Sequence, residues 1–155
     1  MRRMGIFLLL LASGLCRVDA GGGPGGIVVY PAEGTFDEVI DNVKMAIEER
    51  GLLVSGILHA SDMLNRTGKD LGFPPVFKRA ESVEFCSALV AHKMTQTAPQ
   101  NMAVCPFTIS VYVRADQPGH TYVAYQQPWL AGDAQAARAA IQEMLDGIAR
   151  EAIEE

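Results

Sequence analysis

The stretch from residue 83 to residue 113 holds the side chains of this chain that are best suited to chemistry. It contains Cys86 and Cys105, each beside an expected strand end, whereas the third cysteine, Cys16, lies near the N-terminus. In an oxidising compartment such a pair can form a disulfide. The two residues could instead be inert buried thiols or functional thiols, although the Cys-x-x-Cys spacing of many redox sites is missing. The sequence leaves these three interpretations open.

Histidine and methionine side chains form a second candidate group. His92 and Met94 fall on an expected short helix, and Met102 falls on the loop that follows it. Histidine and methionine are common axial ligands of haem iron, so these residues are candidate ligands for a metal or for haem b. Because Cys-x-x-Cys-His is missing, such a haem would be held without covalent attachment. The alternative is that methionines at helical spacing fill the core.

His59 stands where an expected strand meets an expected helix, a position from which side chains often project toward a cleft. It is therefore a candidate ligand-binding residue or proton donor. The alternative is a partly buried histidine that hydrogen-bonds a nearby carbonyl group.

The motif content favours binding over catalysis and leaves open whether the protein is an enzyme. Gly-x-Ser-x-Gly, His-Glu-x-x-His and the glycine-rich nucleotide motifs do not occur in the sequence. A nucleophile pair of Cys86 or Cys105 with His92 has no further support. We therefore expect a binding or sensing module for a small ligand, with a thiol–disulfide redox protein or a cysteine-nucleophile enzyme as the alternative.

Residues 1–20 are predicted to be a secretory signal peptide. Arg2 and Arg3 precede an apolar run from Ile6, and small or apolar residues follow at the cleavage positions. The run is shorter than the roughly 20 apolar residues that a membrane-spanning helix needs. Residues 21–26 are predicted to be a glycine-rich tether. The mature chain is then expected to be periplasmic or secreted, with no segment left in the membrane.

The acidic balance of the chain restricts its partners. The formal net charge is −5, and the predicted cleavage makes it more negative because it removes three arginines. A nucleic-acid binder needs a basic patch that neutralises phosphates, and a protein that docks on anionic lipid needs a polybasic stretch. The sequence has neither, so we expect no nucleic-acid partner and no membrane partner.

The elements that must position these residues follow from hydrophobic spacing. Residues 27–30 and 52–58 are predicted strands, separated by a helix over residues 35–50 in which Thr35 and Glu38 form a capping box. Ser61 is predicted to start a short helix that ends by Gly68. Residues 71–77 are predicted to be a loop whose phenylalanines, Phe73 and Phe77, fold back onto the edge of the core.

The second half of the chain reads as strand, helix, strand, strand and helix. The predicted ranges are 82–85, 88–97, 107–113, 120–125 and 133–153, with a hairpin loop over residues 115–119. Residues 27–155 are therefore predicted to form a single α+β domain. It contains a mixed sheet of about five strands, helices packed on that sheet, a C-terminal hairpin and a long terminal helix.

The sequence resembles the bacterial domain of unknown function 302 over residues 36–128. The shared features are a helix that ends in glycine, Phe85-Cys86 before a short helix, Cys105-Pro106 before a strand, Val111-Tyr112, and the segment YVAYQQP. The family's leucine-proline-cysteine at this strand entry reads Val104-Cys105-Pro106 here. The resemblance implies a small α+β fold and a homodimer, in which haem or another small ligand would lie at a dimer groove.

Overall fold

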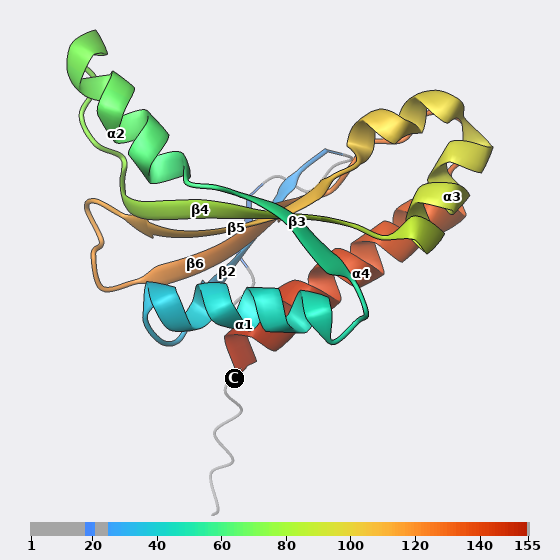
Figure 1. The fold of residues 1–155 in the computed structure, drawn as a ribbon, viewed down its shortest axis with the longest axis horizontal. Helices are drawn as coiled ribbons and strands as arrows, with labels where there is room; N and C mark the ends of the chain where they lie inside the picture. The colour runs from blue at the N-terminus through green and yellow to red at the C-terminus, as the bar shows by residue number, and fades with distance from the viewer. Residues whose placement is uncertain (1–17, 21–24, 155) are drawn as a thin grey trace, which may run out of the picture.

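One sheet organises the part of the chain that the computed structural model describes, residues 18–20 and 25–154. In spatial order its strands are β1, β2, β6, β5, β4 and β3 (Figure 1). Their bounds are Val18–Ala20 for β1, Ile27–Ala32 for β2, Leu53–Leu58 for β3, Phe77–Cys86 for β4, Phe107–Arg114 for β5 and Thr121–Gln126 for β6. The predicted α+β class, with about five strands and a C-terminal hairpin of β5 and β6, is confirmed.

The sheet is antiparallel, which corrects the prediction of a mixed sheet. Each pairing between the described strands runs antiparallel. β2 and β3 are joined through a helix and run in the same direction, but three strands separate them. A hydrophobic pattern indicates which segments are strands, whereas their spatial order depends on pairing between distant segments.

Two helices cover one face of this sheet. Helix α1, Phe36–Glu48, packs over β3, β4 and β5, and helix α4, Gln135–Glu154, packs over β2 and β6. Both lie below the sheet in Figure 1. The capping box is confirmed, because Glu38 N donates to Thr35 Oγ1 and Thr35 N donates to the Glu38 carboxylate at 2.7 Å. Gly51 follows α1 with a φ of +68°, which favours glycine.

The remaining helices lie at the two ends of the molecule (Figure 1). Helix α2, Ala60–Leu71, packs on β4 and projects beyond the sheet. Helix α3, Ala88–Thr97, and the 3₁₀ helix η1, Pro99–Val104, connect β4 to β5 at the opposite end. Among the described residues, no helix therefore covers most of the sheet face opposite α1 and α4.

Three predicted boundaries between residues 60 and 104 are wrong. Helix α2 continues through Gly68 and ends before Gly72, which has a φ of +75°. The Phe73 amide donates to the Gly68 carbonyl at 2.9 Å, so the chain after the helix closes onto that glycine. Strand β4 starts at Phe77, five residues earlier than predicted, because it pairs with the whole of β5. Residues 99–104 form η1 instead of a loop.

The predicted signal peptide and tether fall mostly outside the described residues. From the signal range, Val18–Ala20 is described, and this short strand pairs with β2. From the tether range, Gly25 and Gly26 are described, and the Gln127 amide donates to the Gly26 carbonyl at 2.9 Å. No helix within residues 25–154 combines the length and apolar character that a bilayer-spanning segment needs.

Candidate functional site

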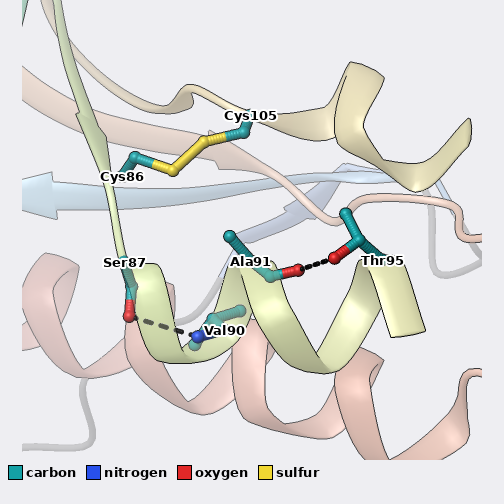
Figure 2. The surroundings of a disulfide bond; sticks show 6 residues. All are labelled: Cys86, Ser87, Val90, Ala91, Thr95 and Cys105. Carbon is teal, nitrogen blue, oxygen red and sulfur yellow. Dashed lines mark hydrogen bonds between the residues drawn. A yellow bond between two sulfur atoms is a disulfide. The ribbon is translucent and has the colours of Figure 1, made fainter. Parts of the chain in front are cut away.

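A disulfide joins the two ends of the α3–η1 excursion, the segment of residues 87–104 that connects β4 to β5. Cys86 is the last residue of β4, and Cys105 lies between η1 and β5. Their Cα atoms are 6.2 Å apart, within the usual range for a bridge, and the two sulfurs are bonded (Figure 2). Of the three interpretations of this pair, the structure shows the disulfide. A cysteine nucleophile requires a free thiol, which the bonded pair does not offer.

Strand register brings the two cysteines together. Phe85 and Phe107 are directly opposite each other in β4 and β5, and their ring centroids are 6.1 Å apart. The residues just outside this pair must therefore lie close to each other at the same rim of the sheet. Helix α3 begins at once, with the Ser87 hydroxyl accepting from the Val90 amide at 3.4 Å (Figure 2).

A buried amide anchors the far side of this excursion. The Asn101 side chain is 3% exposed, and its Nδ2 donates to the carbonyls of Met94 and Ala131 at 2.9 and 3.2 Å. Its Oδ1 accepts from the Ala131 amide at 2.8 Å. Asn101 thus ties η1 both to α3 and to the segment that leads into α4. Sequence reasoning did not single it out, because nothing local distinguishes a buried asparagine from one in a loop.

The structure does not bring the candidate haem ligands to one cavity. Met94 is wholly buried in the core, whereas His92 is exposed and Met102 is 55% exposed. Val90 and Met94 are one helical turn apart and both are buried, so that face of α3 packs inward. Met94 cannot reach a ligand outside the core without a rearrangement. Within the described residues, no three His, Cys, Asp or Glu side chains gather in a way that could hold a metal ion.

His59 lies at the start of α2 and belongs to a surface network of charges. Its Nδ1 is 3.4 Å from a carboxylate oxygen of Glu81, and its side chain is 60% exposed. Arg79 contacts the same carboxylate at 3.3 Å and also contacts Asp37 at 2.6 Å. Hydrogen bonding to Asp37 raises the pKa of Arg79. This arrangement fits a surface ion-pair network that joins α1, α2 and β4.

The cleft beside α2 was not among the candidate sites predicted from the sequence. It has a volume of about 750 Å³ and lies between the inner side of α2 and the loop over residues 72–76. Phe73 is 68% exposed, so the prediction that it folds onto the core is wrong. Phe77 is half-buried, and its ring lies edge-on to Tyr112 at 5.6 Å rather than against the core beneath α1 and α4. The apolar segment LGFPPVF, residues 71–77, was the sequence signal for this cleft. Its exposure to solvent was not predicted.

The walls of this cleft expose more apolar surface than folding alone requires. Leu71 is 67% exposed and Val76 is 63% exposed, close to the value for Phe73. Single exposed apolar side chains are ordinary on soluble proteins, but contiguous groups mark ligand or partner sites. The cleft is lined by Leu64, Asn65, Thr67, Gly68, Lys69, Leu71, Phe73, Pro74, Pro75, Val76 and Phe77.

The sheet face without α1 and α4 carries polar and aromatic side chains. Ser82 and Ser110 share a hydrogen bond of 2.7 Å across β4 and β5, and the rings of Tyr112 and Tyr122 stack at 5.3 Å. Burial raises the pKa of the Tyr112 phenol. A smaller hollow of about 320 Å³ lies near the η1 end, with Val104, Pro106, Thr108, Ser110 and Gln126 among its lining residues.

One carboxylate ties α4 to two strands of the sheet. Asp146 accepts hydrogen bonds from the phenols of Tyr30 and Tyr125 at 2.5 and 2.8 Å. Arg150 Nε donates to its other oxygen at 2.8 Å. Burial alone would raise the pKa of this carboxyl, but the hydrogen bonds from Tyr30, Arg150 and Tyr125 outweigh it and hold the pKa below its ordinary value. The network is structural, because it lies between the helix layer and the sheet.

The fold and its closed helical excursion define a class of small α+β domains. Residues 28–154 match the family model "Domain of unknown function DUF302". The chain therefore belongs to the DUF302 family, and the resemblance that the sequence indicated is confirmed. No curated protein matches the chain.

A solved structure supports the same fold. It is the crystal structure of an uncharacterized conserved DUF302 protein from Bacillus stearothermophilus, with a TM-score of 0.65 and 15% sequence identity. The match covers 81% of this chain and 97% of that one. At this identity the comparison shows the α+β fold and carries no information about activity.

Proposed function

We propose that this chain is an exported binding module that takes a small apolar ligand in the α2 cleft. The observation that carries the proposal is the cleft itself, which is open and apolar and has a volume of about 750 Å³. Pockets that enclose most of a small ligand have volumes of roughly 300–1,000 Å³ and mainly apolar walls. Export is supported by the signal-like N-terminal residues and by the Cys86–Cys105 disulfide, a bond typical of oxidising compartments.

Haem is the ligand that the cleft supports least. Among the described residues that line it, none is histidine, methionine or cysteine, the side chains that usually bind haem iron. His92 and Met102, the exposed candidates, lie on α3 and η1 at the other end of the molecule. A hemin titration tests this directly. We expect no saturable shift of the Soret band, and a one-to-one shift that His92→Ala removes would restore haem as the ligand.

Binding of a neutral apolar dye tests the proposed function. N-phenyl-1-naphthylamine should bind saturably to the purified chain with one site per chain, and Leu71→Glu should weaken that binding about tenfold or more, because a charge in the apolar wall must be desolvated. Leu89→Glu is the matched control. Leu89 on α3 is 66% exposed, almost equal to Leu71, and does not line the cleft. Equal losses in the two variants, or no saturable binding, would contradict the proposal.

Thiol–disulfide exchange is the second candidate function. The observation that favours it is the place of the Cys86–Cys105 bond, which is half-buried at the rim of the sheet rather than enclosed in the core. An exchange-active disulfide must be accessible to an attacking thiolate. The reduction of insulin by dithiothreitol should be accelerated by the wild-type chain and not by Cys86→Ala. No acceleration by the wild-type chain would eliminate this candidate.

A further inference from the structure

We propose that the α2 cleft binds an acidic amphiphile, a molecule with a flexible apolar chain and a carboxylate head, and that Lys69 binds the carboxylate. This inference rests on the proposed function, since it names the ligand class for the same cleft. The evidence for it is that polar side chains are unevenly distributed around the lining of the cleft. The loop side is apolar throughout, and the polar side chains all come from α2.

The apolar side of the cleft suits a chain rather than a rigid polar molecule. Phe73, Pro74, Pro75, Val76 and Phe77 form this side in one continuous segment. None of these side chains offers a hydrogen-bond donor or acceptor. An elongated alkyl group would bury apolar surface against this segment, at about 25 cal/mol per Å² of area removed from water.

The polar side of the cleft offers positive charge and no negative charge. Lys69 is the cation among the lining residues, and none of the described lining residues is acidic. Its ammonium group forms no ion pair with another described residue, although several exposed arginines elsewhere do. In a chain with a formal net charge of −5, a cation at an apolar cleft favours an anionic head group.

The other polar lining groups fit the same head group. Thr67 Oγ1 donates to the Met63 carbonyl at 3.0 Å, so its proton is already used within α2. The Asn65 amide can donate, and together with Lys69 it gives donors of the kind that a carboxylate accepts. A cationic amphiphile would meet the Lys69 charge instead, and a neutral ester would leave it without a partner.

Three amphiphiles with the same chain and different heads test the proposal. Dodecanoate, methyl dodecanoate and dodecyltrimethylammonium, all below their aggregation concentrations, compete with N-phenyl-1-naphthylamine for the full chain. We expect dodecanoate to bind about tenfold tighter than the ester, which is the range expected for one charge-assisted hydrogen bond. The ammonium compound should bind more weakly than the ester.

Variants at one position assign the head-group contact. Lys69→Met keeps the length of the side chain and should make acid and ester bind equally, and Lys69→Glu should reverse the order in favour of the ammonium compound. Lys93→Glu is the control, because Lys93 is also an exposed helical lysine but lies on α3, outside the cleft. It should leave the wild-type order unchanged.

The outcomes separate this inference from the function on which it rests. If acid and ester bind equally to the wild-type chain, or if Lys93→Glu has the same effect as Lys69→Glu, the head-group assignment is wrong while the apolar binding module stands. If the dye binds but no amphiphile displaces it, the ligand class is wrong. If nothing binds because a second copy of the chain fills the cleft, as a concentration-dependent dimer that Leu71→Glu dissolves would show, both proposals fail.

Discussion

At the scale of single residues, Asp146 contributes to the acid sensitivity of the fold. Its folded pKa lies below the ordinary value of 3.8, so the stability it contributes is complete above that value and is lost as pH falls through the folded pKa. Asp146→Asn should lower the free energy of unfolding at neutral pH by about 1–3 kcal/mol, because two buried phenols lose a charged acceptor. It should also flatten the decline of stability below pH 4. Urea unfolding at several pH values measures both effects.

Glu143→Gln is the control for that experiment. Glu143 lies on the exposed side of the same helix, and the variant makes an equivalent exchange of carboxylate for amide. Its unfolding free energy should stay within about 0.5 kcal/mol of wild type. An equal loss in both variants would show that the charge of α4, rather than the contacts with Tyr30 and Tyr125, is responsible.

Asn101 gives a second prediction at this scale. Asn101→Ala removes one accepted and two donated hydrogen bonds from a buried site. The Ala131 amide and carbonyl lose the Asn101 side chain as a partner, while the Met94 carbonyl keeps only the Ala98 amide at 3.3 Å. We expect a loss of about 2–3 kcal/mol in urea unfolding. Gln100→Ala, at an exposed neighbouring position in η1, should change little. A loss below about 0.5 kcal/mol for Asn101→Ala would mean that water replaces the amide.

At the scale of elements, the disulfide holds the α3–η1 excursion to the sheet. The bridge joins residues that are 19 apart in sequence, and a loop of this size is expected to stabilise the fold by about 3 kcal/mol, mainly by restricting the unfolded chain. Reduction should therefore lower the urea midpoint of the wild-type chain. The double variant Cys86→Ala, Cys105→Ala should have the lower midpoint already and should not respond to reductant.

Two results would contradict this role of the disulfide. If reductant left the wild-type midpoint unchanged while a thiol assay showed that Cys86 and Cys105 were both free, then Asn101, Val90 and Met94 would be sufficient to hold the excursion. If reductant lowered the midpoint of the double variant equally, the effect would not come from the bridge.

What could be predicted from sequence depended on whether a feature is local. The capping box of Thr35 and Glu38 needs only four consecutive residues, and the pattern of α4 needs only its own helical period, so both were predicted correctly. The sequence placed Cys86 and Cys105 beside two expected strand ends, but it left the disulfide as one of three interpretations. The burial of Met94 and the open position of Phe73 depend on what packs against them, which no local pattern encodes.

At the scale of the whole molecule, we predict that two copies pair through the uncovered sheet face. Leu58 is 45% exposed there and Leu53 is 82% exposed, and both register with residues of β4 that point away from α1. Sedimentation equilibrium at micromolar concentration should give a dimer. Leu58→Glu should shift it toward monomer, while Leu89→Glu on α3 should not. A wild-type monomer at that concentration would contradict the prediction.

The bulge in β3 has a consequence for solubility. The pairing register shifts between Val54 and Gly56, which leaves Ser55 without a partner position on β4. β3 is the outermost of the described strands on its side of the sheet. An irregular border strand is a poor template for the backbone of another molecule. Deleting Ser55 would straighten that border and leave the pairs of Leu53 with Cys86 and Leu58 with Ser82 in register. Such a chain would offer an unbroken ladder of amide and carbonyl groups, and it should assemble into fibres under conditions in which the wild-type protein remains in solution.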